Sequence, residues 1–207
     1  MAKFEGHRDE VNAVKWDPTG SLLASCSDDC TAKVWSVDSE EKPKLDLHGK
    51  EGHEKEIYTI KWSPTGAGTA NPDRPLLLAT ASFDKTVKVS QCRICLSRLF
   101  KALKGINTDP VSDCMFQLWD VHAGGTCYAT LSGHNHPIYS IAFSPCGQYL
   151  CSGSIDNSVR IWSVKEGTLL RKHRGEGEIF EVAWNSAGTK VAACFSNHAV
   201  TVLDFRA

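Results

Sequence analysis

The sequence predicts an all-β protein made of four similar units, each built from short antiparallel strands. Three observations carry this prediction. β-Branched and aromatic residues alternate with polar ones over runs of about six residues, Gly, Pro, Asp and Ser interrupt these runs, and the same order of segments recurs along the chain. With 207 residues, 42% of them hydrophobic, the chain has enough apolar mass for a folded core.

The four units share one internal order: a Gly-His or similar start, an alternating strand, a turn, a second strand, a turn on Asp and a third strand. We place the repeats at 6–45, 52–131, 133–172 and 175–207. The alternation is clear in the first strands, for example VNAVKW at 11–16 and IYTIKW at 57–62. Four strands in each unit of about 40–45 residues is the pattern of a β-propeller blade.

The Gly-His pairs, the Asp turns and the strand-ending tryptophans resemble those of the WD-repeat β-propeller family. The WD dipeptide itself occurs at Trp119–Asp120. In that family a His, a Ser or Thr, the Asp and the Trp form a buried hydrogen-bonded network within a blade. The resemblance therefore implies three structural networks: His7, Asp29 and Trp35; His53, Asp84 and Trp119; and His134, Asp156 and Trp162. In the fourth repeat Glu176, Asn197 and Leu203 stand at these positions, so we expect no network there.

Longer segments are similar to the C-terminal repeats of the transducin-beta-like corepressor proteins, which include plant histone-deacetylase-associated WD-repeat proteins. Two such segments are EIYTIKWSPTGAGTANPDRPLLLATASFDKTVK and IFEVAWNSAGTKVAACFSNHAVTVLDFRA. In that family eight WD repeats follow a LisH motif and an F-box-like segment, and this chain matches the last four. The resemblance implies a non-catalytic scaffold in a nuclear corepressor and histone-deacetylase complex. The alternatives are a generic, cytoplasmic or nuclear, WD-repeat adaptor such as a ubiquitin-ligase substrate receptor, and a truncated product without function.

The segment 89–117 does not fit the repeat and is expected to interrupt the third strand of the second unit. Without it, TVK would run directly into LWDV. It begins with Val, whose codons all start with GT, and ends with Gln, which CAG encodes. Because GT and AG are the boundary letters of a spliceosomal intron, we interpret the segment as a retained or mispredicted intron. Its Cys92 and Cys95 have no second cysteine pair at the spacing of a zinc site, and we expect neither a metal nor a redox function for them.

Several classes of function are disfavoured by composition and motifs. The 23 basic and 24 acidic side chains give a net charge of −1, so we expect no direct nucleic-acid or membrane partner. Ser, His and Asp recur once in each repeat, whereas a nucleophile needs one unique constellation. We therefore expect no enzyme, no catalytic residue, no cofactor and no metal. The nine cysteines are read as reduced thiols, mostly small hydrophobic residues in strands.

What remains is recognition of proteins. In WD-repeat proteins the narrow top face, formed by the loops that enter the first strands and the turns before the third strands, docks protein partners. The matching positions are Asn12, Asp28, Tyr58, Phe83, Tyr139, Ile155 and Phe180. Four of them are aromatic, and rigid aromatic side chains dominate binding hot spots, although some could instead pack between blades. Acidic residues nearby would favour a basic partner such as a histone tail: Asp9, Glu10, Glu54, Glu56, Glu176 and Glu178.

The number of blades is the remaining question. Propellers close on themselves with 4–8 blades, and blades of this type belong to rings of seven or eight. Four blades would cover about half of such a ring and would leave open sheet edges. We therefore expect a truncated product, a homo-oligomer in which a second copy completes the ring, or an arc that docks on another subunit.

Overall fold

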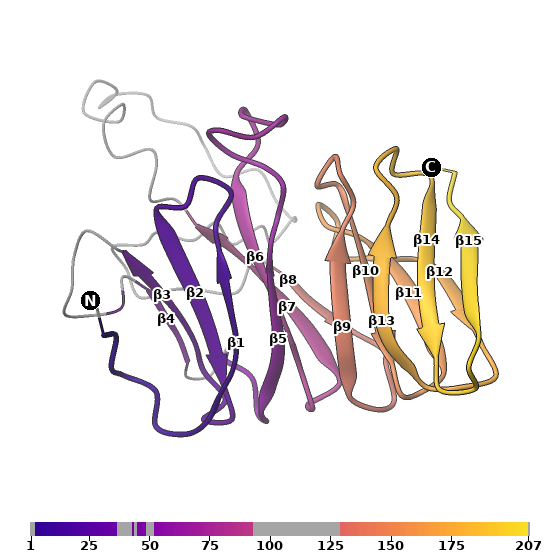
Figure 1. Cartoon of the computed structure of the whole chain (residues 1–207), viewed down its shortest axis with the longest axis horizontal. Helices are drawn as coiled ribbons and strands as arrows, with labels where there is room; N and C mark the ends of the chain where they lie inside the picture. Colours follow the sequence, from indigo (N-terminus) through magenta and orange to yellow (C-terminus); the bar gives the residue numbers. More distant parts are fainter. Residues whose placement is uncertain (1–2, 37–42, 44, 49–51, 93–128, 207) are drawn as a thin grey trace, which may run out of the picture.

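The computed structural model describes residues 3–36, 43, 45–48, 52–92 and 129–206. These residues form strands and turns without a helix, which confirms the predicted all-β class. In the same residues no helix is long and apolar enough to cross a membrane. The strands make four antiparallel sheets that stand side by side in sequence order (Figure 1), and we call them blades 1 to 4.

The strands of each blade pair in sequence order. Blade 1 contains β1 (Val11–Trp16), β2 (Leu22–Ser27), β3 (Ala32–Ser36) and β4 (Leu45–Leu47). Blade 2 contains β5 (Ile57–Trp62), β6 (Leu76–Ser82), β7 (Thr86–Cys92) and β8 (Ala129–Ser132). Blade 3 contains β9 (Ile138–Phe143), β10 (Tyr149–Ser154), β11 (Ser158–Ser163) and β12 (Leu169–Arg174). Blade 4 contains β13 (Ile179–Trp184), β14 (Lys190–Phe195) and β15 (Val200–Asp204).

The hydrophobic core lies between blades rather than within them. Three apolar clusters each join two successive blades, and the first strand of each following blade supplies buried residues such as Ile60, Ile141 and Val182. Two of these first strands, β5 and β13, also end in a tryptophan whose side chain hydrogen-bonds to the preceding blade. The indole Nε1–H of Trp62 donates to the Lys15 carbonyl at 2.9 Å, and that of Trp184 donates to the Ala142 carbonyl at 3.1 Å. Each blade is therefore stabilised by its neighbour, as in other repeat architectures.

The turn between the second and third strands has the same backbone in all four blades. Its last residue takes a positive φ of 64–72° in each case, at Cys30, Lys85, Asn157 and His198. Because few L-residues adopt this conformation without cost, its recurrence shows that the turn is fixed by the hydrogen bonds around it.

The segment 89–117 does not interrupt the third strand at the expected point. β7 continues through Val89 to Cys92, because Val89 follows Val87 in the buried alternation and both side chains are fully buried. Ser90 pairs with Leu78, as Trp35 pairs with Leu23 and Trp162 with Leu150. Ser90 thus occupies the strand position that tryptophan holds in blades 1 and 3. The rest of the segment, with Cys95, lies outside the described residues, and so does the predicted network residue Trp119.

Candidate protein-interaction surface

The predicted His–Asp–Trp network is present in blades 1 and 3. In blade 3, His134 Nδ1 lies 2.9 Å from Asp156 Oδ2, and His134 Nε2 lies 2.8 Å from Ser152 Oγ. The Trp162 indole donates to the same Ser152 hydroxyl at 2.9 Å. Blade 1 repeats this chain with nearly the same distances, through His7, Asp29, Ser25 and Trp35.

Blade 2 has the same network as far as the structure describes it. His53 Nδ1 lies 2.7 Å from Asp84 Oδ2, and His53 Nε2 lies 2.8 Å from Thr80 Oγ1. Thr80 thus stands where blades 1 and 3 have serine. Its hydroxyl donates to the Lys88 carbonyl at 3.4 Å.

Burial and hydrogen bonding set the charges of these groups. Burial lowers the pKa of His134 to about 4, despite the neighbouring Asp156 carboxylate. Burial opposes ionisation of Asp156, but hydrogen bonds from Ser158 and the contact with His134 outweigh it and lower its pKa to about 2. The pKa values of Asp29 and Asp84 are held well below their usual range because hydrogen bonds again outweigh burial. At neutral pH the turns of blades 1, 2 and 3 therefore each carry an ionised aspartate.

Blade 4 departs from this pattern. Glu176, at the histidine position, is exposed, and Asn197, at the aspartate position, accepts a hydrogen bond from the Ala199 amide at 3.3 Å. Leu203 stands at the tryptophan position and packs against the apolar cluster between blades 3 and 4. Apolar packing takes the place of the polar network in this blade.

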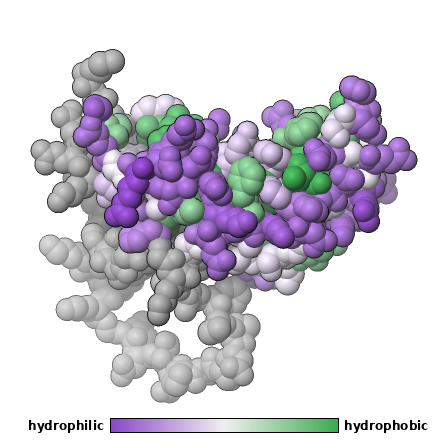
Figure 2. Space-filling view, turned by 90° about the horizontal axis from the view of Figure 1, so that it is seen from below, coloured by the Kyte–Doolittle hydropathy of each residue, from purple (hydrophilic) through white to green (hydrophobic). Residues whose placement is uncertain are grey.

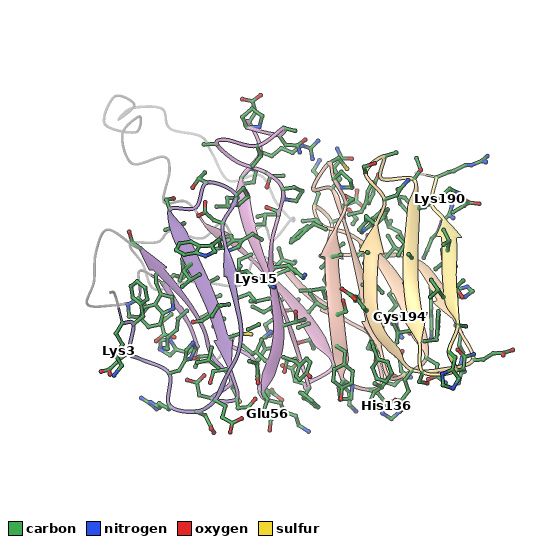
Figure 3. The ribbon with its side chains drawn as sticks, in the orientation of Figure 1. Lys3, Lys15, Glu56, His136, Lys190 and Cys194 are labelled. Atoms are coloured by element: carbon green, nitrogen blue, oxygen red, sulfur yellow. The ribbon has the colours of Figure 1, made fainter. Side chains whose placement is uncertain are left out.

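The three networks hold the turns that form the top face, which points downward in Figures 1 and 3 and faces the viewer in Figure 2. In each blade, one backbone hydrogen bond joins the residue directly before the first strand to the turn between the second and third strands. Its donor is the residue before the network aspartate or its equivalent: Asp28 N to Glu10 O, Phe83 N to Glu56 O, Ile155 N to Pro137 O and Ser196 N to Glu178 O. The first-strand loops and the turns therefore make one continuous surface.

Four of the predicted contact residues meet on this surface in a continuous aromatic cluster. Tyr58 touches Phe83 and Tyr139, with ring centroids 5.8 and 4.9 Å apart, and Phe83 lies 6.0 Å from Tyr139. Tyr139 also contacts Phe180, at 6.1 Å. All four contacts are edge-to-face, the geometry that aromatic pairs prefer. Tyr58 and Phe180 remain 44% and 51% exposed, so this aromatic row, which spans blades 2 to 4, reaches solvent.

The other three predicted contact residues are hydrogen-bonded or half-buried within the fold. The Asn12 side-chain amide donates to Asp28 Oδ1 at 2.5 Å and to the Ile57 carbonyl at 3.1 Å, so it ties blade 1 to blade 2. Asp28 and Ile155 are half-buried and precede the network aspartates. Whether any of the seven contacts a partner stays a prediction.

Acidic side chains also lie on this face. Glu10, Glu56 and Glu178 occupy the same position, directly before the first strand of their blades, and all three are exposed. Figure 3 shows Glu56 and His136 at this face and Lys190 at the opposite one, and Figure 2 shows hydrophobic residues interspersed among hydrophilic ones. These acidic groups also affect Cys30. Burial raises the pKa of its thiol most, and the negative charges of Glu56 and the nearby aspartates raise it further. The surface therefore favours cationic groups.

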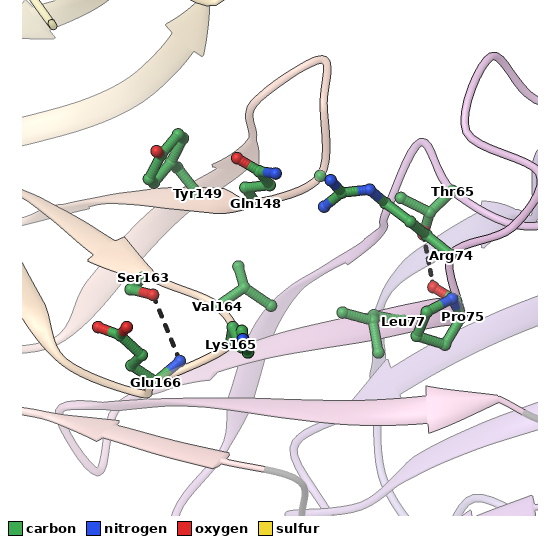
Figure 4. Close-up of a pocket in the computed structure, with 11 residues that line it drawn as sticks. Thr65, Arg74, Pro75, Leu77, Gln148, Tyr149, Ser163, Val164, Lys165 and Glu166 are labelled. Carbon is green, nitrogen blue, oxygen red and sulfur yellow. Dashed lines mark hydrogen bonds between the residues drawn. The ribbon is translucent and has the colours of Figure 1, made fainter. Parts of the chain in front are cut away.

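A pocket of about 450 Å³ lies on the opposite face, between blades 2 and 3 (Figure 4). Arg74, Lys165 and Glu166 line it together with apolar residues such as Leu77 and Val164. This pocket could not be predicted from the sequence, because its residues come from four separate loops and strand ends. Its mixed charges favour no single class of ligand.

Cysteines and metal-binding types of residue form no site in the part of the chain that the structure describes. No group of three or more His, Cys, Asp or Glu side chains there could hold a metal ion. Cys26 and Cys151 are fully buried in strands, and burial raises the pKa of each thiol to about 12. They pack as small apolar residues.

Comparison with known proteins agrees with this architecture. The family model "WD domain, G-beta repeat" matches residues 1–36, 46–89 and 125–163, which together are more than half of the chain. It leaves 90–124 unmatched, a range that overlaps the irregular segment 89–117.

Relatives with this repeat extend over nearly the whole chain. The WD40 repeat-containing protein HOS15 of Arabidopsis thaliana is 49% identical over 98% of this chain and 28% of its own length. The F-box-like/WD repeat-containing protein TBL1X of Mus musculus is 48% identical over 98% of this chain and 32% of its own length. TBL1Y of Homo sapiens is 47% identical over 97% of this chain and 32% of its own length. The chain thus spans about a third or less of the length of each of these three relatives, and it belongs to the WD40 repeat family.

Proposed function

We propose that the chain is a non-catalytic scaffold of a nuclear corepressor and histone-deacetylase complex, and that its top face binds a basic segment of a protein partner. The observation that carries the proposal is the partly exposed aromatic row of Tyr58, Phe83, Tyr139 and Phe180 beside the acidic positions Glu10, Glu56 and Glu178. Aromatic side chains supply contact area at low entropic cost, and acidic neighbours select cationic partners.

The likeness to HOS15 and TBL1X supports the biological setting, and the surface chemistry supports the kind of ligand. Deacetylase and corepressor subunits are the proposed partners, and a lysine-rich histone tail is the proposed basic segment. Unmodified lysines are cationic and suit this surface, whereas acetylation removes their charge. The surface would therefore favour the deacetylated tail, the product of the enzyme in the proposed complex.

The test is affinity purification of the tagged chain from nuclear extract, with detection of histone-deacetylase subunits and of histones. The double variant Tyr58→Ala/Phe180→Ala removes the two most exposed rings of the aromatic row and should recover less histone. The control variant Arg74→Ala/Lys165→Ala changes only the pocket on the opposite face and should recover as much histone as the wild-type chain. Absence of deacetylase subunits from the wild-type sample would contradict the complex. Equal recovery of histones with the two variants would contradict the surface.

A further inference from the structure

The outer strand of blade 3 is basic along most of its length. β12 has the sequence LLRKHR, and all six of its residues are exposed. Residues 165–174 contain four lysine or arginine side chains and one acidic side chain, Glu166. The outer strands of blades 1 and 2 differ, since β4 has the sequence LDL and β8 the sequence ATLS. Among the outer strands that the structure describes, the basic run therefore belongs to blade 3 and is not a feature of the repeat.

Most of these basic side chains lack an acidic partner. Arg171 donates to two backbone carbonyls, at and after the end of β15, at 3.2 and 3.1 Å. Among the described residues, no carboxylate forms an ion pair with Lys172, His173 or Arg174. The positive charge of β12 is therefore open to an anionic group from outside the blade.

The register of β12 with β11 makes this charge unfavourable within the blade. Lys172 lies directly opposite Arg160, whose nearest carboxylate is Asp156 at 3.7 Å. In blade 1 the corresponding pair is Lys33 of β3 and Asp46 of β4, which form an ion pair. Opposite charges across a sheet stabilise it, whereas directly opposed like charges destabilise it. Blade 3 thus gains nothing from Lys172 in folding, and an external carboxylate would relieve the repulsion.

β12 is also the edge of its sheet. The strand order is β12-β11-β10-β9, so one side of β12 pairs with β11 and the other has no partner strand in the described part of the chain (Figure 1). The backbone groups on that outer side form a row of donors and acceptors to which an extended peptide can add. A second copy of β12 would bring the same positive charge, so pairing between copies is disfavoured and an acidic strand is favoured.

We propose that β12 binds an acidic, extended segment of a partner protein, which adds to blade 3 as a fifth strand. A peptide strand is favoured over a nucleic acid because it matches both the N–H and the C=O groups of the edge. β12 also carries no aromatic side chain on which bases could stack. The edge of β12 is separate from the top face, so the proposed function of that face is not needed for it.

The side chains of β12 define the chemistry of the segment. Lys172 and Arg174 lie on one face of the sheet, and Arg171 and His173 lie on the other. Because cross-strand partners share a face, a run of four acidic residues would meet these four side chains. The two leucines before Arg171 are each 42% exposed and would meet apolar residues. In an antiparallel addition the segment therefore has four acidic residues followed by two apolar ones.

The test measures binding of the full chain to a fluorescein-labelled peptide with four glutamates followed by two valines at its centre, by fluorescence anisotropy. The wild-type chain should bind at low salt, and rising salt should weaken binding. Lys172→Gln/Arg174→Gln removes both cations from one face and should weaken binding about tenfold. The control Arg8→Gln/Lys55→Gln removes one exposed arginine and one exposed lysine elsewhere and should keep the wild-type affinity. Circular dichroism should show the same β signal in all three chains, because the four substituted side chains are exposed.

Two N-methylated peptides separate strand addition from ionic attraction alone. One carries methyl groups on alternate amides and the other on the remaining amides, so both keep every charge. Only one side of an added strand pairs with β12, so one peptide should lose most of its binding and the other should keep it. Equal affinities of these two peptides would overturn strand addition. An oligothymidylate with four phosphates that binds as tightly as the peptide would overturn the choice of a protein partner. A wild-type chain that does not bind the peptide, or equal effects of the two double variants, would overturn the site itself.

Discussion

At the residue scale, one arrangement of protons with a neutral histidine satisfies the network of blade 3. The Trp162 indole donates to Ser152 Oγ, so the Ser152 hydroxyl can donate to His134 Nε2, and His134 Nδ1–H then donates to the Asp156 carboxylate. A neutral histidine with an ionised aspartate satisfies this chain, which agrees with the lowered pKa values of both groups. These contacts were predicted by the resemblance to the WD-repeat family, in which a His, a Ser or Thr, an Asp and a Trp form one network in each blade.

The first prediction concerns the aspartate. Asp156 accepts hydrogen bonds from His134, Asn135 N, Ser158 N and Ser158 Oγ. Asp156→Ala leaves these donors without their acceptor and should lower the free energy of unfolding by about 2–3 kcal/mol. Asn197→Ala at the matching position of blade 4 loses one long hydrogen bond and should cost less than about 1 kcal/mol. Urea denaturation at pH 7 measures both, and equal losses would contradict the proposed role of the network.

The second prediction concerns pH. The pKa of His134 is about 4 in the folded chain, against about 6.5 when it is solvated, so between these values the unfolded chain binds more protons. Stability should therefore fall as the pH drops from 6.5 towards 4, with a slope of up to about 1.4 kcal/mol per pH unit from this group. Below pH 4 the aspartates with lowered pKa values add to the loss. His134→Gln should remove the slope between pH 6.5 and 4.5 in urea titrations, and an unchanged slope would assign it to other groups.

At the scale of the elements, the order of strands and turns was predictable because Gly-His, Asp and Trp mark the ends of strands. The path of the third strand of blade 2 was not. We expected this strand to break after Lys88, but it continues to Cys92. The first residue of the irregular segment, Val89, is apolar and fits the buried position that follows Lys88. The alternation of apolar and polar residues cannot predict this continuation, because any apolar residue at position 89 keeps the alternation intact.

The third prediction follows from that strand. Deleting residues 89–117 joins Lys88 to Leu118 and puts Trp119 at the strand position of Ser90, which corresponds to Trp35 and Trp162. The indole could then donate to Thr80 Oγ1, as the other two donate to Ser25 and Ser152. Burying this ring should raise the free energy of unfolding by about 2 kcal/mol or more.

The control for this deletion is Trp119→Phe in the shortened chain. It keeps most of the apolar ring but removes the indole N–H, so about 1 kcal/mol of the gain should disappear. Thermal and urea unfolding of the full and shortened chains measure the difference. A shortened chain that is less stable than the full one would show that the segment contributes to the fold.

At the scale of the whole molecule, the arrangement of blades decides which predicted surface residues meet. The sequence identified Tyr58, Phe83, Tyr139 and Phe180 as members of one face, but their ring contacts depend on the angle between successive blades. The link of Asn12 to both Asp28 and Ile57 likewise needs two blades in place. The net charge of −1 was equally uninformative, because it does not reveal that three exposed glutamates, Glu10, Glu56 and Glu178, lie on the same face as the aromatic row.

The last prediction uses this uneven charge. A lysine-rich histone-tail peptide should bind the wild-type chain with an affinity that falls as salt rises, because exposed charges are screened. Glu56→Lys reverses a charge beside Tyr58 and Phe83 and should weaken binding about tenfold at low salt, chiefly through slower association. Glu166→Lys makes the same change in net charge on the opposite face and should weaken binding much less. Fluorescence anisotropy measures the affinity of each of the three proteins for the unmodified and for the lysine-acetylated peptide. Equal effects of the two variants would mean that net charge, rather than the top face, attracts the peptide.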